Sequence, residues 1–241
     1  MYFAIATSVQ LLTFGDSGYA DELLWGAART LQIAILSYAF GLGLGLCGAA
    51  GKLSGRPWLR RLVDGYTTLF RAIPELVLIL LLYYAGTVGI NQFFARLGFQ
   101  AIEVNGLVAA VVVLGIVQGA YSTEVLRAAI QAVPAGQVEA AKACGMPPLL
   151  RFRRIVLPAM LPYAISGLAN LWLNATKESA LISVVGFTEL FSATKQAAGM
   201  SKQYFMFYSI AALAYLSITL VSNRAFGWLE RRTRRGQPNL A

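Results

Sequence analysis

Long apolar stretches alternate with shorter polar ones along this chain. A helix needs about 20 largely apolar residues to cross the hydrocarbon layer of a membrane. The predicted spans are Leu23 to Ala50, Leu62 to Ile90, Val104 to Val133, Leu161 to Phe187, and Phe205 to Leu229. Only helices and closed barrels satisfy every backbone polar group in lipid, and the short alternating segments of a barrel are missing. We therefore expect an all-α integral membrane protein with five transmembrane helices.

No connection between these stretches is long or polar enough to be a linker, so one transmembrane domain is expected over residues 23–229. Segment 1–22 precedes it and a basic tail, 230–241, follows it. Met1 to Phe14 is apolar and uncharged, but it is too short to span and lacks the basic start of a signal peptide. We interpret 1–22 as an interfacial segment on the outer, periplasmic surface.

Small residues recur at close spacing in two spans. They are Gly41, Gly45 and Gly48 in the first span, and Gly115 and Gly119 in the third. Such spacing lets helix backbones approach closely. The glycines indicate either tight packing within the subunit or a dimer face.

Composition and charge support the membrane class and orient the chain. Apolar residues make up 57% of the chain, charged residues 13%, and the net charge is +9. Of the 20 basic residues, 15 lie between Lys52 and Arg71, between Arg127 and Arg154, or near the C-terminal end. This bias follows the positive-inside rule and predicts an outside N-terminus and a cytoplasmic C-terminus. A nucleic-acid-binding face would not alternate with the spans in this way.

The same orientation places Cys47 and Cys144 in a reducing compartment, where we expect free thiols. The chain has no His, which removes the commonest metal ligand, and no metal site is predicted.

The cytoplasmic connection, residues 134–160, looks structured. Pro134 and Gly136 end the third span's helix, and Gln137 to Cys144 favours a short helix with Glu139 in its first turn. Gly145 is placed as its C-terminal cap. A second helix begins after the next two prolines, carries Arg151, Arg153 and Arg154, and is expected to stop at Pro158. We call this connection, residues 134–160, the elbow. Its length indicates either a docking surface for a soluble partner or a structure that lies on the lipid surface.

This connection resembles the EAA loop of binding-protein-dependent ABC importer permeases. The matching signature positions are Glu139, Ala140, Ala141, Gly145, Ile155, Leu157 and Pro158. Five helices and an outside N-terminus are similar to the polar-amino-acid subgroup, the histidine, lysine, arginine, ornithine and opine permeases. A second stretch, Arg71 to Leu76, is similar to that family's R-G-x-P-x-L. Ala72 stands there in place of the usual Gly.

The resemblance implies an inner-membrane subunit of a type I ABC importer, whose EAA helix inserts into a cleft on a cytoplasmic ATPase dimer. The elbow then carries the ATPase motion to the spans, with Glu139 and Gly145 central to the coupling. This chain has no phosphate-binding G-x-x-x-x-G-K-[ST] loop, so ATP and Mg are expected on the partner ATPase. The other implied partners are a second permease subunit, identical or homologous, and a periplasmic solute-binding protein. The expected cargo is a polar amino acid, with a basic amino acid or an opine as candidates.

Polar and ionisable residues within the spans are candidates for the solute pathway, because charges in a membrane are costly. They are Thr123, Glu124, Asn174, Lys177, Glu178 and Ser179. Glu124 could equally belong to an internal charge pair. Lys177 and Glu178 point about 100° apart on a helix, so each needs another partner. Glu75 is interpreted as a local partner of Arg71 at the inner edge, without a transport role.

Three other functions agree less well with the sequence. A stand-alone secondary transporter or channel usually carries internal repeats, and none is evident here. A membrane enzyme needs clustered ligands or a nucleophile with its base, which a chain without His does not offer. A structural anchor leaves the elbow unexplained.

Overall fold

The computed structural model describes residues 11–15, 18–100 and 105–234, and this part of the chain is helical without any strand. Five of its helical segments are long and apolar enough to cross a membrane, which confirms the expected fold class. They are α2 (Ala20–Leu53), α4 (Glu75–Arg96), α5 (Gly106–Gln131), the stretch Pro148–Val185, and α10 (Tyr204–Thr233). Most of the interfacial segment and most of the basic tail fall outside the described residues. The tail's first residues continue α10.

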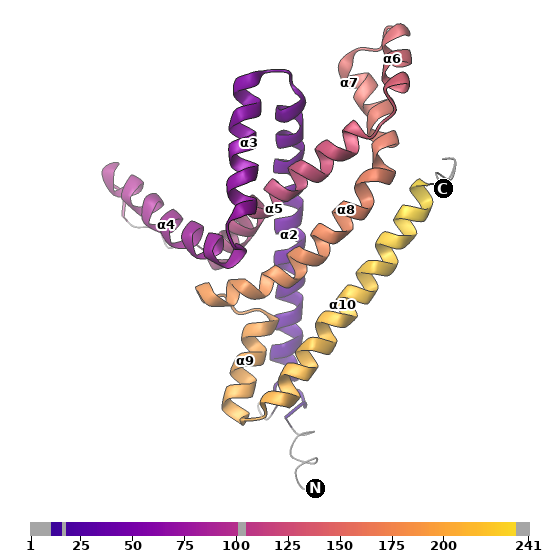
Figure 1. Ribbon diagram of the computed structural model, residues 1–241. Helices are drawn as coiled ribbons and strands as arrows, with labels where there is room; N and C mark the ends of the chain where they lie inside the picture. The colour runs from indigo at the N-terminus through magenta and orange to yellow at the C-terminus, as the bar shows by residue number, and fades with distance from the viewer. Residues whose placement is uncertain (1–10, 16–17, 101–104, 235–241) are drawn as a thin grey trace.

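Helices α2 and α5 form the central pair of the bundle, and the glycines of both spans lie between them (Figure 1). A Cβ at Gly45 would lie 2.5 Å from the Ser122 Cβ, and one at Gly48 would lie 2.2 Å from the Thr123 Oγ1. Gly41, Gly115 and Gly119 meet the facing helix in the same way. These residues therefore pack helices within one subunit, and the dimer-face interpretation is wrong for them.

The predicted second span, Leu62 to Ile90, is divided in the structure. Helix α3 (Pro57–Ala72) ends where Ile73 becomes extended, and α4 starts after Pro74. Proline disfavours the helical conformation of the residue before it, which explains the break. Pro74 therefore precedes the spanning helix and does not lie inside it. Helix α4 projects away from the other helices and leaves most of its apolar surface exposed (Figure 1).

The fourth span is longer than predicted, because the chain stays helical through Pro158. The short α7 (Pro148–Arg151) passes into a π-helical turn, η1 (Phe152–Val156), then into α8 (Leu157–Glu178) and the 3₁₀ turn η2 (Ser179–Val185). Pro158 falls in the first turn of α8 and Pro162 inside it. Proline lacks the N–H that an α-helical hydrogen bond needs, and the wider π turn before Pro158 accommodates this loss. The expectation that Pro158 stops the helix is wrong.

One helix was not predicted. Helix α9 (Leu190–Ser201) occupies the connection between the last two spans, and the buried Glu189 caps its N-terminus. The Glu189 carboxylate accepts four hydrogen bonds, from the Phe191 and Ser192 amides, the Thr30 hydroxyl and the Tyr215 hydroxyl. Burial raises the pKa of Glu189, and these donors oppose that shift. The carboxylate thus ties α9 to α2 and α10.

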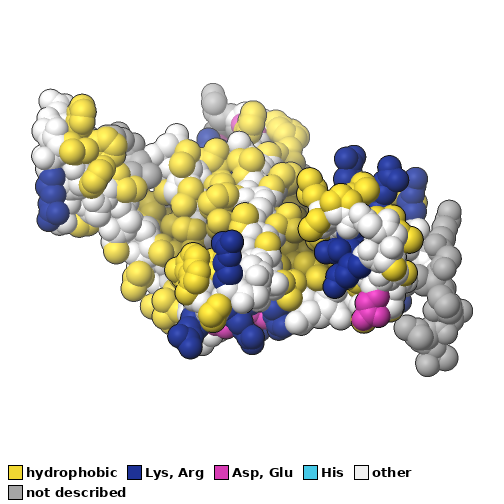
Figure 2. Space-filling view, turned by 90° about the horizontal axis from the view of Figure 1, so that it is seen from above, with side chains coloured by type: hydrophobic (Ala, Val, Ile, Leu, Met, Phe, Trp, Pro, Cys, Tyr) yellow, Lys and Arg dark blue, Asp and Glu magenta, His cyan; other side chains and the backbone are white. Residues whose placement is uncertain are grey.

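The two ends of the bundle differ in character. Helices α6 (Ala135–Ala143) and α7, the beginning of α3 and the end of α10 lie toward one end, whereas α9 and the start of α2 lie at the other (Figure 1). Figure 2 looks onto the first end and shows Lys and Arg side chains gathered around it. The segments predicted to be cytoplasmic therefore share one end.

Candidate functional site

The elbow folds as a helix, a tight turn and a second helix. Helix α6 starts at Ala135, directly after Pro134, so Gly136 lies in its first turn and does not break a helix. Glu139 is the fifth residue of α6, so its expected place in the first turn is wrong. The Gly145 amide donates to the Lys142 carbonyl at 2.9 Å, and the Met146 amide donates to the Ala141 carbonyl at 3.1 Å. This pair of bonds is the Schellman motif, and Gly145 adopts the left-handed φ of +70° that the motif requires.

One face of α6 is anchored to the membrane helices. Ala141 is buried, and a shallow apolar groove beside it is lined by Gln137, Ala140, Ala141, Cys144, Met146 and Ile155. Val138 and Phe152 pack against a buried cluster that joins α2, α5 and α8. The opposite face of α6 is exposed and includes Glu139 and Lys142. The elbow is therefore packed against the bundle on one face of α6 and exposed on the other.

The structure brings only part of the predicted coupling set together. Ala140, Ala141 and Ile155 line the same groove, and Leu157 packs against the anchoring cluster. Glu139 is exposed on the opposite face of α6, and Pro158 belongs to α8. A Cβ at Gly145 would meet no other atom within 4 Å. Glycine is favoured there because of the left-handed backbone conformation and not because of crowding.

A second group of polar residues lies near the middle of α5. Gln118 is 1% exposed and Glu178 is 7% exposed. The Gln118 Nε2 donates a hydrogen bond of 2.7 Å to the Glu178 Oε2. One turn further along α5, the ring of Tyr121 lies under the Arg71 guanidinium, which is 5.7 Å from the ring centroid.

Glu75 belongs to this group, and the sequence analysis missed it. Its carboxylate lies close enough to interact with both Glu178 and Tyr121. The described residues show no Glu75–Arg71 ion pair, so the interpretation of Glu75 as a partner of Arg71 at the inner edge is wrong. The sequence does contain a feature that indicates this position: the carboxylate of Glu75 directly follows Pro74, at the first residue of an otherwise apolar helix.

Glu124 forms the internal charge pair that was one of its two interpretations. Lys52 contacts the Glu124 Oε1, and Arg127 contacts the Glu124 Oε2 at 2.9 Å. Lys52 also reaches the Asp64 Oδ1 at 2.7 Å and the Thr67 hydroxyl at 2.8 Å. The hydrogen bond from Lys52 lowers the pKa of Asp64. Together these contacts join the ends of α2 and α5 to α3.

The remaining pathway candidates divide into buried and exposed residues. The Thr123 hydroxyl donates to the Gly119 carbonyl of the same helix, and the Ser179 hydroxyl donates to the Thr176 carbonyl in the last turn of α8. Asn174 and Lys177 are exposed on α8. Glu178 is thus the candidate that the structure places in a buried polar cluster.

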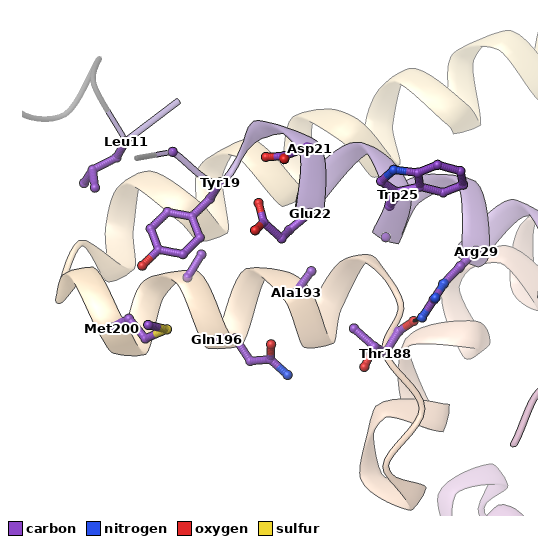
Figure 3. A pocket seen from close by; sticks show the side chains of 13 residues that line it. Leu11, Tyr19, Asp21, Glu22, Trp25, Arg29, Thr188, Ala193, Gln196 and Met200 are labelled. Carbon is purple, nitrogen blue, oxygen red and sulfur yellow. Dashed lines mark hydrogen bonds between the residues drawn. The ribbon is translucent and has the colours of Figure 1, made fainter. Parts of the chain in front are cut away.

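The opposite end of the bundle has a cavity between α2 and α9. Its lining includes Asp21, Glu22, Trp25 and Arg29 from α2 and Gln196 and Met200 from α9 (Figure 3). The acidic pair sits in the first turn of α2, where negative charge suits the helix dipole. Within the described ranges, no group of three or more His, Cys, Asp or Glu side chains could hold a metal ion.

Comparison with known proteins agrees with this arrangement. The family described as "binding-protein-dependent transport system inner membrane component" matches residues 37–235. The chain is 44% identical to the nopaline transport system permease protein NocQ of Agrobacterium fabrum, over 94% of this chain and 97% of that protein. It is 39% identical to the histidine/lysine/arginine/ornithine transport system permease protein HisQ of Escherichia coli, over 89% and 94%.

Two solved structures share the fold. A crystal structure of an amino acid ABC transporter matches with a TM-score of 0.74 and 30% identity, covering 89% of this chain and 95% of that one. An inward-facing structure of the MetNI methionine ABC transporter matches with a TM-score of 0.70 and 22% identity, covering 88% and 95%. The second likeness concerns the fold alone.

Proposed function

This chain belongs to the family of binding-protein-dependent transport system inner membrane components, and we propose that it carries a polar amino acid across the bacterial inner membrane. It is a transport subunit and not an enzyme, since its relatives are named as permease proteins of transport systems. A basic amino acid and an opine are the candidate solutes. Relatives of both kinds support this class, at 37–44% identity.

As a membrane permease of this family, the chain works with an ATPase and with a solute-binding protein. The proposal specifies an ATPase dimer that binds ATP and Mg on the cytoplasmic side, and a second permease subunit, identical or homologous. The N-terminus is proposed to lie outside and the elbow inside, in line with the positive charge gathered at the elbow end.

The observation that carries the coupling proposal is the two-faced α6. Its inner face is anchored to the cluster of α2, α5 and α8, and its outer face presents Glu139. A partner that grips the outer face can therefore move three membrane helices together. Gly145 fixes the angle between α6 and the helical stretch behind it. Ala140, Ala141, Ile155, Leu157 and Pro158 are proposed to maintain the shape of the elbow.

Glu139→Ala tests the coupling in the complete transporter, reconstituted in vesicles. Loss of one well-placed charge at an interface costs about 1–3 kcal/mol, so ATP-driven uptake and ATPase binding are expected to fall about tenfold. Glu22→Ala, at the opposite end of the bundle, is the control and should transport normally. Normal ATPase binding and uptake in Glu139→Ala would remove Glu139 from the coupling. Uptake that needs no ATPase would instead support a stand-alone transporter or channel.

For the solute pathway, the proposal centres on Glu178, with Asn174 and Lys177 exposed on the same helix. Thr123, Glu124 and Ser179 already have partners within the bundle, so we assign them to its internal structure.

A further inference from the structure

Helix α10 lies at the edge of the bundle and leaves one long face uncovered (Figure 1). Its main packing partners are α8 and α9. Leu213, Leu220 and Val221 are 62%, 47% and 69% exposed, and their spacing places them on one face of the helix. This apolar stripe suits contact with the acyl chains of lipids.

The same face of α10 ends in two arginines on either side of a tryptophan. Arg224, Trp228 and Arg231 follow the spacing i, i+4, i+7, so they share one side of the helix. From Tyr204, where α10 begins, to Arg224 the helix rises about 30 Å, which is about the thickness of the hydrocarbon layer. We therefore expect the Arg224 guanidinium where acyl chains give way to headgroups. Trp228 is 55% exposed and is of a residue type enriched at that boundary.

These two arginines have no anionic partner in the part of the chain that the structure describes. Neither Arg224 nor Arg231 forms an ion pair there. The one carboxylate of α10, Glu230, is taken by Arg234 at 3.0 Å. The Arg232 guanidinium lies over the Trp228 ring, 5.2 Å from its centroid. A charged side chain at the edge of a membrane is costly without a counter-charge, so this face needs an anion from outside the chain.

We propose that Arg224, Trp228 and Arg231 form a binding site for the phosphate headgroup of an anionic phospholipid, in the leaflet at the elbow end. A guanidinium donates two parallel hydrogen bonds to phosphate oxygens, and the indole N–H supplies a further donor. The acyl chains of the same lipid lie along the apolar stripe. An anionic lipid is selected over a zwitterionic one because the site has two positive charges and no free carboxylate to hold an ammonium group.

The site adjoins the helix that leads to the elbow. The Trp172 Nε1 of α8 donates a hydrogen bond of 2.8 Å to the hydroxyl of Ser222, which lies two residues before Arg224. A lipid bound at Arg224 therefore braces α10 close to its contact with α8. The helical stretch Pro148–Val185, which contains α8, begins in the elbow. This places the lipid site beside the segment that is proposed to transmit movement.

The test counts phosphatidylglycerol molecules bound to the intact, complete transporter by mass spectrometry during a lipid titration. The double variant Arg224→Gln/Arg231→Gln is expected to bind one tightly held phosphatidylglycerol fewer for each copy of this chain, with the affinity of that site lowered at least tenfold. Arg96→Gln is the control, because Arg96 is an exposed arginine at the end of another spanning helix, α4. An equal count in the double variant and the unsubstituted transporter overturns the site.

Two measurements on the unsubstituted transporter do not depend on the folding of a variant. Phosphatidylglycerol with a diazirine in its acyl chain is expected to cross-link to α10 between Leu213 and Arg224 several-fold more than phosphatidylcholine with the same label. Equal cross-linking of this segment by the two lipids contradicts the selectivity for an anionic headgroup. Inorganic phosphate is not expected to displace the labelled lipid, since it cannot contact the apolar stripe. Displacement by inorganic phosphate would mean that the arginines bind a free anion and not a lipid.

Discussion

At the residue scale, the decisive positions are those where one atom or one torsion angle sets the local structure. Gly145 is such a position, because its φ of +70° lies in the left-handed region and nothing crowds its Cα. The lack of a Cβ contact means that a substitution there acts through the backbone alone. The sequence predicted this turn correctly, since a Gly after an Ala-rich helix is a common C-terminal signal.

Replacing Gly145 by Ala should weaken the coupling between ATP hydrolysis and uptake. The left-handed conformation costs a residue with a Cβ about 1–2 kcal/mol, so the elbow would shift to relieve the strain. We expect solute uptake per ATP hydrolysed to fall several-fold. Asn tolerates this conformation better, so Gly145→Asn should retain more coupling than Gly145→Ala. Gly199→Ala, in α9 with open space around it, is the matched control. Equal coupling in all three variants would contradict the role of the turn.

Glu75 shows what sequence patterns miss at this scale. In the sequence it lies four residues from Arg71, so a local ion pair was a reasonable interpretation. The break at Pro74 starts a new helix there and changes the direction of the side chain. Its actual neighbours, Glu178 and Tyr121, are 46 or more positions away in the sequence. Contacts of this kind follow from helix packing, which local spacing does not encode.

At the element scale, hydropathy located every spanning helix but not all of the breaks. The predicted span from Leu62 to Ile90 covers both α3 and α4, and the break between them lies at Pro74. Helix α9 is too short to resemble a span, and its cap is a buried Glu189 whose partners come from other helices. The elbow was predicted more fully, because its turn and its helix depend on neighbouring residues.

The α2–α5 pair should tolerate no added methyl group where the helices touch. A Cβ at Gly45 would lie 2.5 Å from the Ser122 Cβ and 3.0 Å from the Ser122 backbone carbon. Such overpacking typically costs about 1–3 kcal/mol, so Gly45→Ala should lower the Tm of the purified protein in detergent. Gly43→Ala, on the exposed side of the same helix, meets nothing within 4 Å and benefits from the better helix propensity of Ala. A Tm of Gly45→Ala equal to that of Gly43→Ala would mean that the helices can separate without cost.

At the scale of the whole molecule, the elbow and the buried polar group around Glu178 belong to one continuous helical stretch. The helical stretch Pro148–Val185 begins in the elbow and carries Glu178 near its far end. Its π turn, η1, lies between them and packs on the anchoring cluster through Phe152. Movement of α6 by a soluble partner would therefore be transmitted along one helix to the proposed solute site. This connection explains how a force applied outside the membrane can open or close a site within it.

Transmission of movement from a soluble ATPase to the membrane helices requires that the elbow face the cytoplasm, and this orientation can be tested. Cys144 is a free, exposed thiol at the turn of the elbow, so it reports which side the elbow faces. In a Cys47→Ser background, a membrane-impermeant maleimide should label Cys144 in inside-out vesicles and not in right-side-out vesicles. Ser201→Cys, at the end of α9, should give the opposite pattern when Cys144 is also removed. The expectation follows from the positive-inside rule, because most of the 20 basic residues belong to segments at the elbow end. The reverse labelling pattern would place the elbow on the outer side, where no ATPase could reach α6.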